Sequence, residues 1–457
     1  MVANTRDGYL GNEPDGYHAT MVSWMHARAL LFATEAKAVS SGPQWTTLGL
    51  MRKQLTNIAH ATNVHGVVSS GYGAESALDT NSSFALFLHD YALTTGDRTF
   101  VRTVIVAVRR ALDSAPLRAG LTGGLLTGSL DAPEDQSDAV IDYWDWLRRP
   151  GSVSYPNVLL IHALDCHAEL ERWIGNPGRA SEYANAASDL RDRALGAFWD
   201  DNRGCLAESR LGNAQFHHLY TAVQYLAITS GFLDRTRAAT VMDSLSARLA
   251  ALPETWQSAL AMPTNLCDAS DLMPRFPPPA NGVVEFGHTM NGGSLLSWAY
   301  FEIGALVTLD RVDEAWTRAR AVFNRFESTA LLEGCNYWDY RGRPGRARLE
   351  PFLSDVGLVA SVLPRWFMGV SPQLNRIDLD PALPTPGPCG LRFKHLGTPV
   401  EINIESWLPG KFAIQISGVV VPLRLLMRGR PLAHESVSVN GIIEITNASG
   451  ELPTIGL

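Results

Sequence analysis

The 457-residue chain lacks several features that would set it apart from ordinary globular proteins. No run of about 18 apolar residues occurs, so we expect no membrane anchor. No block of Lys and Arg is long enough to follow a phosphate backbone, and the formal net charge is −8, which argues against a nucleic-acid partner. The five cysteines include no C-x-x-C spacing, and their odd number argues against a complete disulfide framework.

Targeting and metal-binding signals are also missing. The first residues do not combine a basic segment with an apolar one, so the sequence as given predicts a cytoplasmic protein unless a leader has been removed and replaced by Met1. No spacing typical of metal ligands occurs, and we expect neither a metal nor a cofactor. With 46% hydrophobic and 18% charged residues, the chain can form a large core.

What the chain has in abundance is helical periodicity. Apolar residues recur at helical spacing in blocks that come in pairs, separated by short turns with Gly, Asp or Asn. One hairpin cannot bury its apolar stripe alone, so six hairpins packed side by side are expected to close into an (α/α)6 toroid. The predicted helices are 19–38 with 43–61, 80–95 with 97–113, 153–174 with 178–198, 214–230 with 233–250, 290–308 with 311–327, and one of a sixth pair over 352–368.

The composition and hydrophobic pattern of the sequence change after Pro372. Several prolines are followed by short alternating runs such as VEINIESW and KFAIQISG, which are typical of strands. We therefore predict a helical catalytic domain over 1–375 and a small antiparallel β-sandwich domain over 376–457.

The segments between the predicted pairs are much longer than ordinary connections. Long ordered loops in compact domains are usually functional, so we expect the site on these segments. They are 62–79, 114–152, 251–289 and 328–351.

One of these segments sets carboxylates among aromatic side chains. It contains Asp138, Asp142 and Asp145 beside Tyr143, Trp144 and Trp146. Aromatic faces stack on sugar rings, and a carboxyl group against an indole has its acid form favoured, as a glycosidic general acid requires. The alternative is that Asp142 and Asp145 cap a helix or pair with Arg148 and Arg149.

A second carboxyl group should come from another long segment, because glycosidases flank the scissile bond with two. The candidates are Glu285, Glu333 and Glu350, each of which a solvated or capping role would also explain. Asp79 is placed to cap the helix that begins at residue 80 and could also contact substrate. Further polar candidates near helix starts are His217, His218, His288 and Asn291.

Two of these stretches resemble the six-hairpin glycosidases, the group of glucoamylases, trehalases, rhamnosidases and maltose and cellobiose phosphorylases. Asp142-Tyr-Trp-Asp145 and the residues after it resemble the glucoamylase segment with the general acid after Trp, and trehalases have a similar Gly-Trp-Asp run. Both comparisons imply that Asp145 is the acid. Glu350-Pro-Phe-Leu is similar to the trehalase base.

The resemblance departs at Asn336-Tyr-Trp-Asp339, where Asn336 stands in place of the glucoamylase base. The base therefore stays open among Glu350, Glu333, Asp339 and Glu285. The stretches His288-Thr-Met-Asn-Gly-Gly293 and Leu309–Ala315 also look like clan motifs, and the order of all these motifs along the chain supports the resemblance.

The function that the resemblance implies is an inverting, exo-acting glycoside hydrolase with a carbohydrate substrate. Asp145 would protonate the departing oxygen and Glu350 would activate water. The residues expected to bind substrate are Asp79, Asp142, Trp144, Trp146, Arg148, Glu285, His288, Asn291, Glu333 and Trp338. The alternatives are a phosphorylase, a sugar epimerase or polysaccharide lyase that uses histidines, and a noncatalytic glycan-binding protein.

Overall fold

The computed structural model describes residues 3–4, 9–10, 20–32, 46–68, 78–128, 142, 149–217, 220–251, 263, 296–328, 358–385, 387–408, 411–431, 434–439 and 442–447. The helices of this part are α1 Thr20–Leu30, α2 Thr47–Ala61, α3 Thr80–Thr95, α4 Arg98–Leu112, α5 Ala115–Leu121, α6 Ser154–Trp173, α7 Pro177–Phe198, α8 Thr221–Thr229, α9 Arg235–Ala250, α10 Leu296–Thr308, α11 Val312–Ser328 and the π-helical turn η4 Leu363–Phe367.

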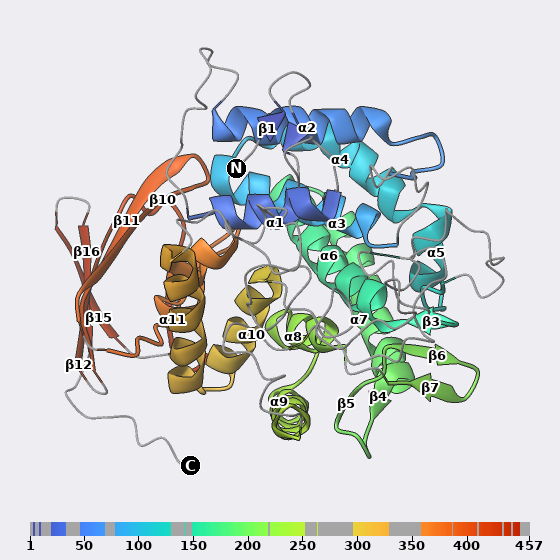
Figure 1. The fold of residues 1–457 in the computed structure, drawn as a ribbon. Coiled ribbons are helices and arrows are strands. Elements are labelled where there is room, and N and C mark those ends of the chain that lie inside the picture. The colour runs from blue at the N-terminus through green and yellow to red at the C-terminus, as the bar shows by residue number, and fades with distance from the viewer. Residues whose placement is uncertain are drawn as a thin grey trace.

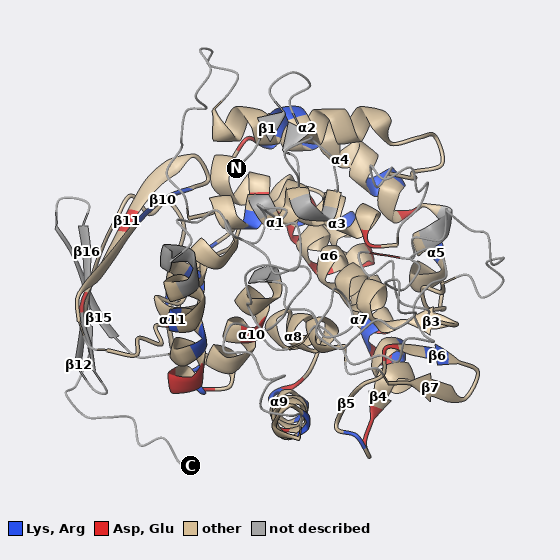
Figure 2. Ribbon diagram, in the orientation of Figure 1, with Lys and Arg blue, Asp and Glu red and all other residues tan. Residues whose placement is uncertain are grey.

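The helices form an inner and an outer set. On α3 every residue from Thr80 to Thr94 is buried, and α6 and α8 are similarly enclosed. In contrast, α9 buries one stripe, Ala238, Val241, Met242 and Leu245, as expected of a helix with one face to solvent. Figure 2 shows the same difference in charge, because α11 carries basic residues along its length whereas α8 has none.

The inner helices follow one another in order around the helical part (Figure 1). Contacts link α1 with α3, α3 with α6, α6 with α8, α8 with α10, and α10 with η4. Four outer helices pack on the inner helix that precedes them, α4 on α3, α7 on α6, α9 on α8 and α11 on α10. The closed ring of six hairpins stays a prediction, because much of the sixth pair lies outside the described residues.

The hinge predicted around Gly96 is confirmed, and two adjacent residues account for it. Gly96 ends α3 in the left-handed conformation with φ 64°, which a residue with a side chain rarely adopts. The Asp97 side chain then accepts a hydrogen bond from the Phe100 N–H and begins α4. Two adjacent residues therefore end one helix and begin the next.

The helix predicted to begin at residue 214 is wrong at its start. Residues 209–211 and 214–216 form a β-hairpin, and α8 begins only at Thr221. Gly212 supplies the turn with φ 58°, and this Gly-Asn turn between alternating residues favours a hairpin over a helix. The hairpin packs onto the strand before α6, and this places it at the first turn of that helix.

Strands dominate after η4. The described strands of the chain are β1 Ala3–Asn4, β2 Tyr9–Leu10, β3 Ser152–Val153, β4 Trp199–Asp200, β5 Cys205–Leu206, β6 Ser209–Leu211, β7 Ala214–Phe216, β8 Val370–Pro372, β9 Ile377–Leu379, β10 Cys389–His395, β11 Thr398–Leu408, β12 Lys411–Ser417, β13 Leu423–Met427, β14 Arg430–Pro431, β15 His434–Val439 and β16 Ile442–Asn447.

Two sheets make up this C-terminal part. The five-stranded sheet, in the order β10-β11-β12-β16-β15, is antiparallel and lies at one side of the helices (Figure 1). The four-stranded sheet, in the order β14-β13-β9-β8, departs from the predicted all-antiparallel arrangement, because β9 and β13 run parallel. Three strands of the other sheet intervene between them in sequence, so a long crossover joins them and not a hairpin.

The sheets contact the helices at the C-terminal end of α3. The turn between β10 and β11 donates two backbone hydrogen bonds to α3, from Leu396 to Leu93 and from Gly397 to Thr94. Phe393 of β10 packs against Phe32 just after α1, with ring centroids 5.8 Å apart. No described helix is long and apolar enough to span a bilayer.

Candidate functional site

The segments that lead into the inner helices meet at the N-terminal ends of those helices, and buried carboxamides hold them there. Asn157, in the first turn of α6, accepts from the Leu126 N–H and donates to the carbonyls of Leu126 and Val153. Gln224 of α8 makes the equivalent pair of bonds with Leu206. We call this end of the helical part the mouth.

Asn81 does the same on α3. Its amide donates to the carbonyls of Gly66 and Ala111, and its oxygen accepts from the Val68 N–H. Three inner helices thus use one device, a buried side-chain amide that satisfies the backbone of an incoming segment. This device positions the mouth without a regular sheet or helix.

A buried ion pair lies at the mouth. Both side chains of Asp142 and Arg149 are fully buried, and two guanidinium nitrogens of Arg149 donate to the two oxygens of Asp142 at 2.6 and 2.8 Å. Burial alone would lower the pKa of Arg149, but the charge and hydrogen bonds of Asp142, together with Tyr220 and Glu208, outweigh it and raise the pKa. The pair is the structural alternative foreseen for Asp142, and it fixes this side chain in place.

Two buried tyrosines stand beside this pair. Tyr155 and Tyr220 pack edge to face with centroids 6.4 Å apart, and the Arg149 guanidinium lies 5.8 Å from the Tyr220 ring. Burial raises the pKa of both phenols well above the ordinary value. For Tyr155 the negative charges of Asp79 and Asp142 add to the shift, so both carboxylates lie near this hydroxyl.

Asp79 occupies the predicted N-cap position of α3, but its side chain makes no capping hydrogen bond. It is buried, with 3% of its surface exposed, and its negative charge contributes to the raised pKa of Tyr155. Capping therefore does not explain this carboxylate, and substrate contact stays a prediction for it.

Most of the predicted site residues lie outside the described residues. These are Asp145 and Glu350, expected to catalyse, and Trp144, Trp146, Arg148, Glu285, His288, Asn291, Glu333 and Trp338, expected to bind substrate. The structure describes two of the predicted residues, Asp79 and Asp142, and it brings both to Tyr155.

Sequence reasoning missed Glu208. This carboxylate is 1% exposed, and its charge acts on Arg149 and Tyr220. The backbone of Glu208 accepts from the N–H and hydroxyl of Ser154, which attaches the β6–β7 hairpin to the start of α6. The available signal was the turn at Gly212, which marks a hairpin whose first strand begins directly after Glu208.

The mouth therefore gathers three buried carboxylates, from Asp79, Asp142 and Glu208, around one arginine and two phenols. Within the described part of the chain, no group of three or more His, Cys, Asp or Glu side chains is arranged to hold a metal ion. The arrangement suits a polar ligand with hydroxyl groups, and it can hold a proton-transfer group in a water-poor setting.

Comparison of the chain with known proteins gives information about its fold. No family model matches the chain, and no curated protein matches it significantly. Among solved structures it is similar to the α-L-rhamnosidase from Aspergillus terreus, with TM-score 0.59, 12% identity, and 97% of this chain and 47% of that one covered. For the enzyme from Dictyoglumus thermophilum the values are 0.58, 11%, 96% and 46%.

A third similar structure is the GH78 family rhamnosidase of Bacillus sp. GL1, with TM-score 0.56, 14% identity, and 89% of this chain and 42% of that one covered. The chain spans a little under half the length of these three structures. Almost all of it nevertheless aligns with them, and so the chain shares its fold with part of each of these rhamnosidases.

Proposed function

We propose that the protein is a glycoside hydrolase whose active site is the mouth. The fold likeness supports this, because the similar structures are rhamnosidases and the sequence motifs independently resemble the group that includes rhamnosidases. Fold alone does not define a reaction, so the proposal depends on the residues at the mouth.

The observation that carries the proposal is the buried pair of Asp142 and Arg149. These two residues directly precede and follow segment 143–148, which contains the proposed acid, Asp145. Their bidentate ion pair holds the two ends of that segment together beside Tyr220. A catalytic group must be fixed to a fraction of an ångström, and a clamp of this kind serves that requirement.

In the proposed reaction Asp145 protonates the departing glycosidic oxygen, and Glu350 removes a proton from a water that attacks the anomeric carbon from the opposite face. The product would then have inverted configuration. Asp79 and Tyr155 would bind hydroxyl groups of the sugar. An α-L-rhamnoside is the first substrate class to test, because the similar structures are α-L-rhamnosidases.

The test is turnover on a panel of aryl α- and β-glycosides, rhamnosides included, with and without phosphate. Phosphate-independent hydrolysis by the wild type should fall at least a hundredfold in Asp145→Asn and in Glu350→Gln, since general acid–base groups contribute about 10²–10⁴-fold. Asp189→Asn, exposed on α7, is the matched control and should keep full activity. A phosphorylase would need phosphate, and activity indifferent to both substitutions would contradict the site.

A further inference from the structure

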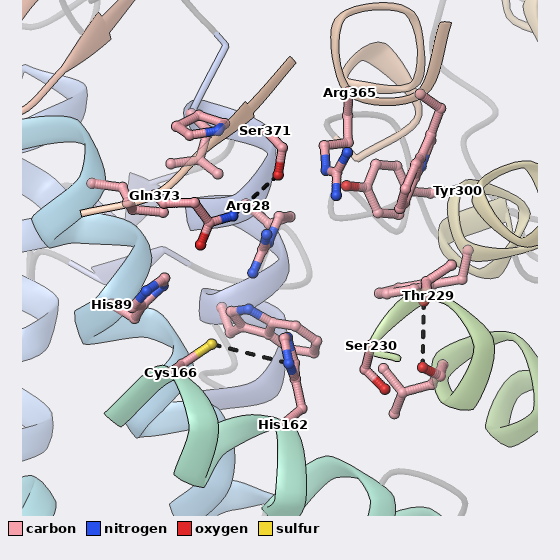
Figure 3. A pocket seen from close by; sticks show the side chains of 17 residues that line it. Arg28, His89, His162, Cys166, Thr229, Ser230, Tyr300, Arg365, Ser371 and Gln373 are labelled. Atoms are coloured by element: carbon pink, nitrogen blue, oxygen red, sulfur yellow. Dashed lines mark hydrogen bonds between the residues drawn. The ribbon is translucent and has the colours of Figure 1, made fainter. Parts of the chain in front are cut away.

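A cavity of about 180 Å³ lies away from the mouth, near the C-terminal ends of the inner helices. Cys166 on its wall lies eleven residues after Tyr155, or about 16 Å further along α6. The strand β8 covers the cavity through Ser371 and Gln373 (Figure 3). A single water needs only about 15 Å³ by this kind of measure, so the cavity has room for a ligand of several heavy atoms.

The described wall of this cavity is basic. It contains two arginines and two histidines, Arg28, Arg365, His89 and His162, but no Asp or Glu. Figure 3 shows both arginine side chains directed toward the space between the helices and β8. Since the space lies between packed helices and β8, these charges are screened less than they would be at an open surface.

The positive charges near the cavity can be matched with carboxylates one by one. Arg28 pairs with Asp90 at 3.0 Å, and His89 pairs with Glu169 at 2.8 Å. Burial alone would lower the pKa of His89, but Cys166 and these carboxylates together raise it well above the ordinary value, which favours the charged form of the ring. Arg365 is the cation that remains.

Among the described residues no carboxylate lies within ion-pairing distance of Arg365. Its nearest acidic neighbours are already engaged, because Asp378 accepts from Arg376 and Arg424, and Asp380 accepts from the Gly429 N–H. Burial and repulsion by Arg28 both lower the pKa of Arg365. A guanidinium nevertheless stays protonated in proteins, so Arg365 carries a charge that has no direct ion-pair partner among the described residues.

The side chain of Arg365 is held in position rather than free to turn to solvent. Its guanidinium carbon lies 4.2 Å from the centre of the Trp366 ring, and a Cβ at Gly304 would come within 2.4 Å of that indole. The absence of a side chain at Gly304 thus lets Trp366 lie on α10, and Trp366 in turn supports the flat face of the guanidinium. The N–H edge of Arg365 is left for a ligand.

We propose that this cavity is a binding site for a small oxyanion, a carboxylate or a phosphate group, held by Arg365 together with Arg28. The planar guanidinium matches the two oxygens of such a group, and one negative charge would offset both the unmatched charge and the repulsion between the arginines. The Ser230 and Tyr300 hydroxyls offer further polar contacts on the same wall. The site is independent of the proposed hydrolase activity.

The test is calorimetric titration of the full chain with inorganic phosphate and, separately, with malonate, at constant ionic strength set by sodium chloride. Saturable binding of either anion is expected in the wild type. Arg365→Met should weaken it about ten- to a hundredfold, the range for lost charge-assisted hydrogen bonds. Arg392→Met removes the same charge from an exposed position on β10 and should leave the affinity unchanged.

The melting temperature provides a second readout that separates a binding defect from misfolding. Without anion, Arg365→Met should melt at or above the wild-type temperature, because it removes a half-buried charge that is repelled by Arg28 and has no direct ion-pair partner among the described residues. Phosphate or malonate should raise the melting temperature of the wild type only. Binding of phosphate alone would identify a phosphate-bearing ligand, and tighter binding of malonate a carboxylate. No saturable binding in the wild type, or equal affinity in Arg365→Met, would overturn the proposal.

Discussion

The two ends of the inner helices are built from opposite charges. At the mouth, the described residues include three buried carboxylates, Asp79, Asp142 and Glu208, and one buried cation, Arg149. The described wall of the cavity near the other end has arginines and histidines and no carboxylate. A helix carries partial positive charge at its N-terminus and negative charge at its C-terminus, so acids at the first end and cations at the second are both favoured.

The two ends also differ in how they are held. Side-chain amides of Asn81, Asn157 and Gln224 hold the segments of the mouth, whereas β8 and packed aromatic rings enclose the cavity. Irregular segments can vary without disturbing the helices, as catalytic loops on a rigid scaffold do. The comparison agrees with the two proposals, chemistry at the mouth and ligand binding at the cavity, and four predictions test it.

The largest expected effect comes from breaking the buried pair at the mouth. Arg149→Met leaves Asp142 buried without its partner and should lower the free energy of unfolding by about 3–5 kcal/mol, measured by denaturant titration. The double variant Asp142→Leu/Arg149→Met should recover much of this loss. Arg392→Met, at an exposed pair, is the control and should be near wild type. Equal stability of Arg149→Met and the wild type would show that the clamp does not hold the mouth.

The next effect tests the amide device. Asn157→Ala removes three hydrogen bonds and takes away the acceptor of the buried Leu126 N–H, which should cost about 2–4 kcal/mol. Asn185→Ala, exposed on α7, should have little effect on stability. If the two variants unfold at the same denaturant concentration, the segment before α6 is held by something other than Asn157.

A smaller effect is expected on the cavity side. Gly304→Ala places a methyl group where Trp366 lies and should cost about 1–3 kcal/mol through overpacking, with weaker anion binding because the support of Arg365 shifts. Gly196→Ala, on α7 where a Cβ meets nothing within 4 Å, should be neutral or slightly stabilising. Thermal unfolding of the two variants side by side measures the difference, and equal melting temperatures would contradict the packing argument.

The smallest effect on stability is expected at Cys166, where the main prediction concerns the reactivity of the thiol. Burial alone would raise the pKa of this thiol, but His89 and His162 outweigh it and lower the pKa to about 6. Alkylation by iodoacetamide should rise with pH through about 6, whereas burial raises the pKa of Cys205, which should stay unreactive at neutral pH. Peptide mass spectrometry identifies the modified residue.

The same shift fixes the sign of a stability effect. Because the pKa of the Cys166 thiol is lower in the folded chain than in the unfolded one, the thiolate stabilises the fold above the ordinary thiol pKa. That contribution is lost as the pH falls through about 6.

Phosphate in the cavity should also slow the alkylation of Cys166. A reaction midpoint near the ordinary value of 9 would contradict the charge arrangement.

Sequence patterns predicted the helices well where local signals were strong. α3 coincides with the predicted 80–95, since apolar spacing and the glycine at its end agree. The start of α8 was missed because a two-residue turn outweighed apolar periodicity over 214–220. The parallel pairing of β9 with β13 depends on a long crossover, which no local pattern encodes.

The site was predictable only in part. The aromatic and acidic texture of 136–150 drew attention to Asp142, and the position of Asp79 before a helix drew attention to that residue. The burial of Glu208, Tyr155 and Tyr220 follows from tertiary packing, and so does the set of charged groups that surround Arg365. These depend on residues far apart in sequence, which spacing alone does not bring together.

The most direct test of the central claim, general acid catalysis at the mouth, is the leaving-group dependence of Asp145→Asn. The variant should lose about 10²–10⁴-fold in kcat/KM on an alkyl glycoside, whose departing oxygen needs a proton. It should keep most of its activity on the dinitrophenyl glycoside of the same sugar, whose leaving group departs without one. Equal losses on both substrates, or no loss on either, would contradict the assignment of Asp145 as the acid.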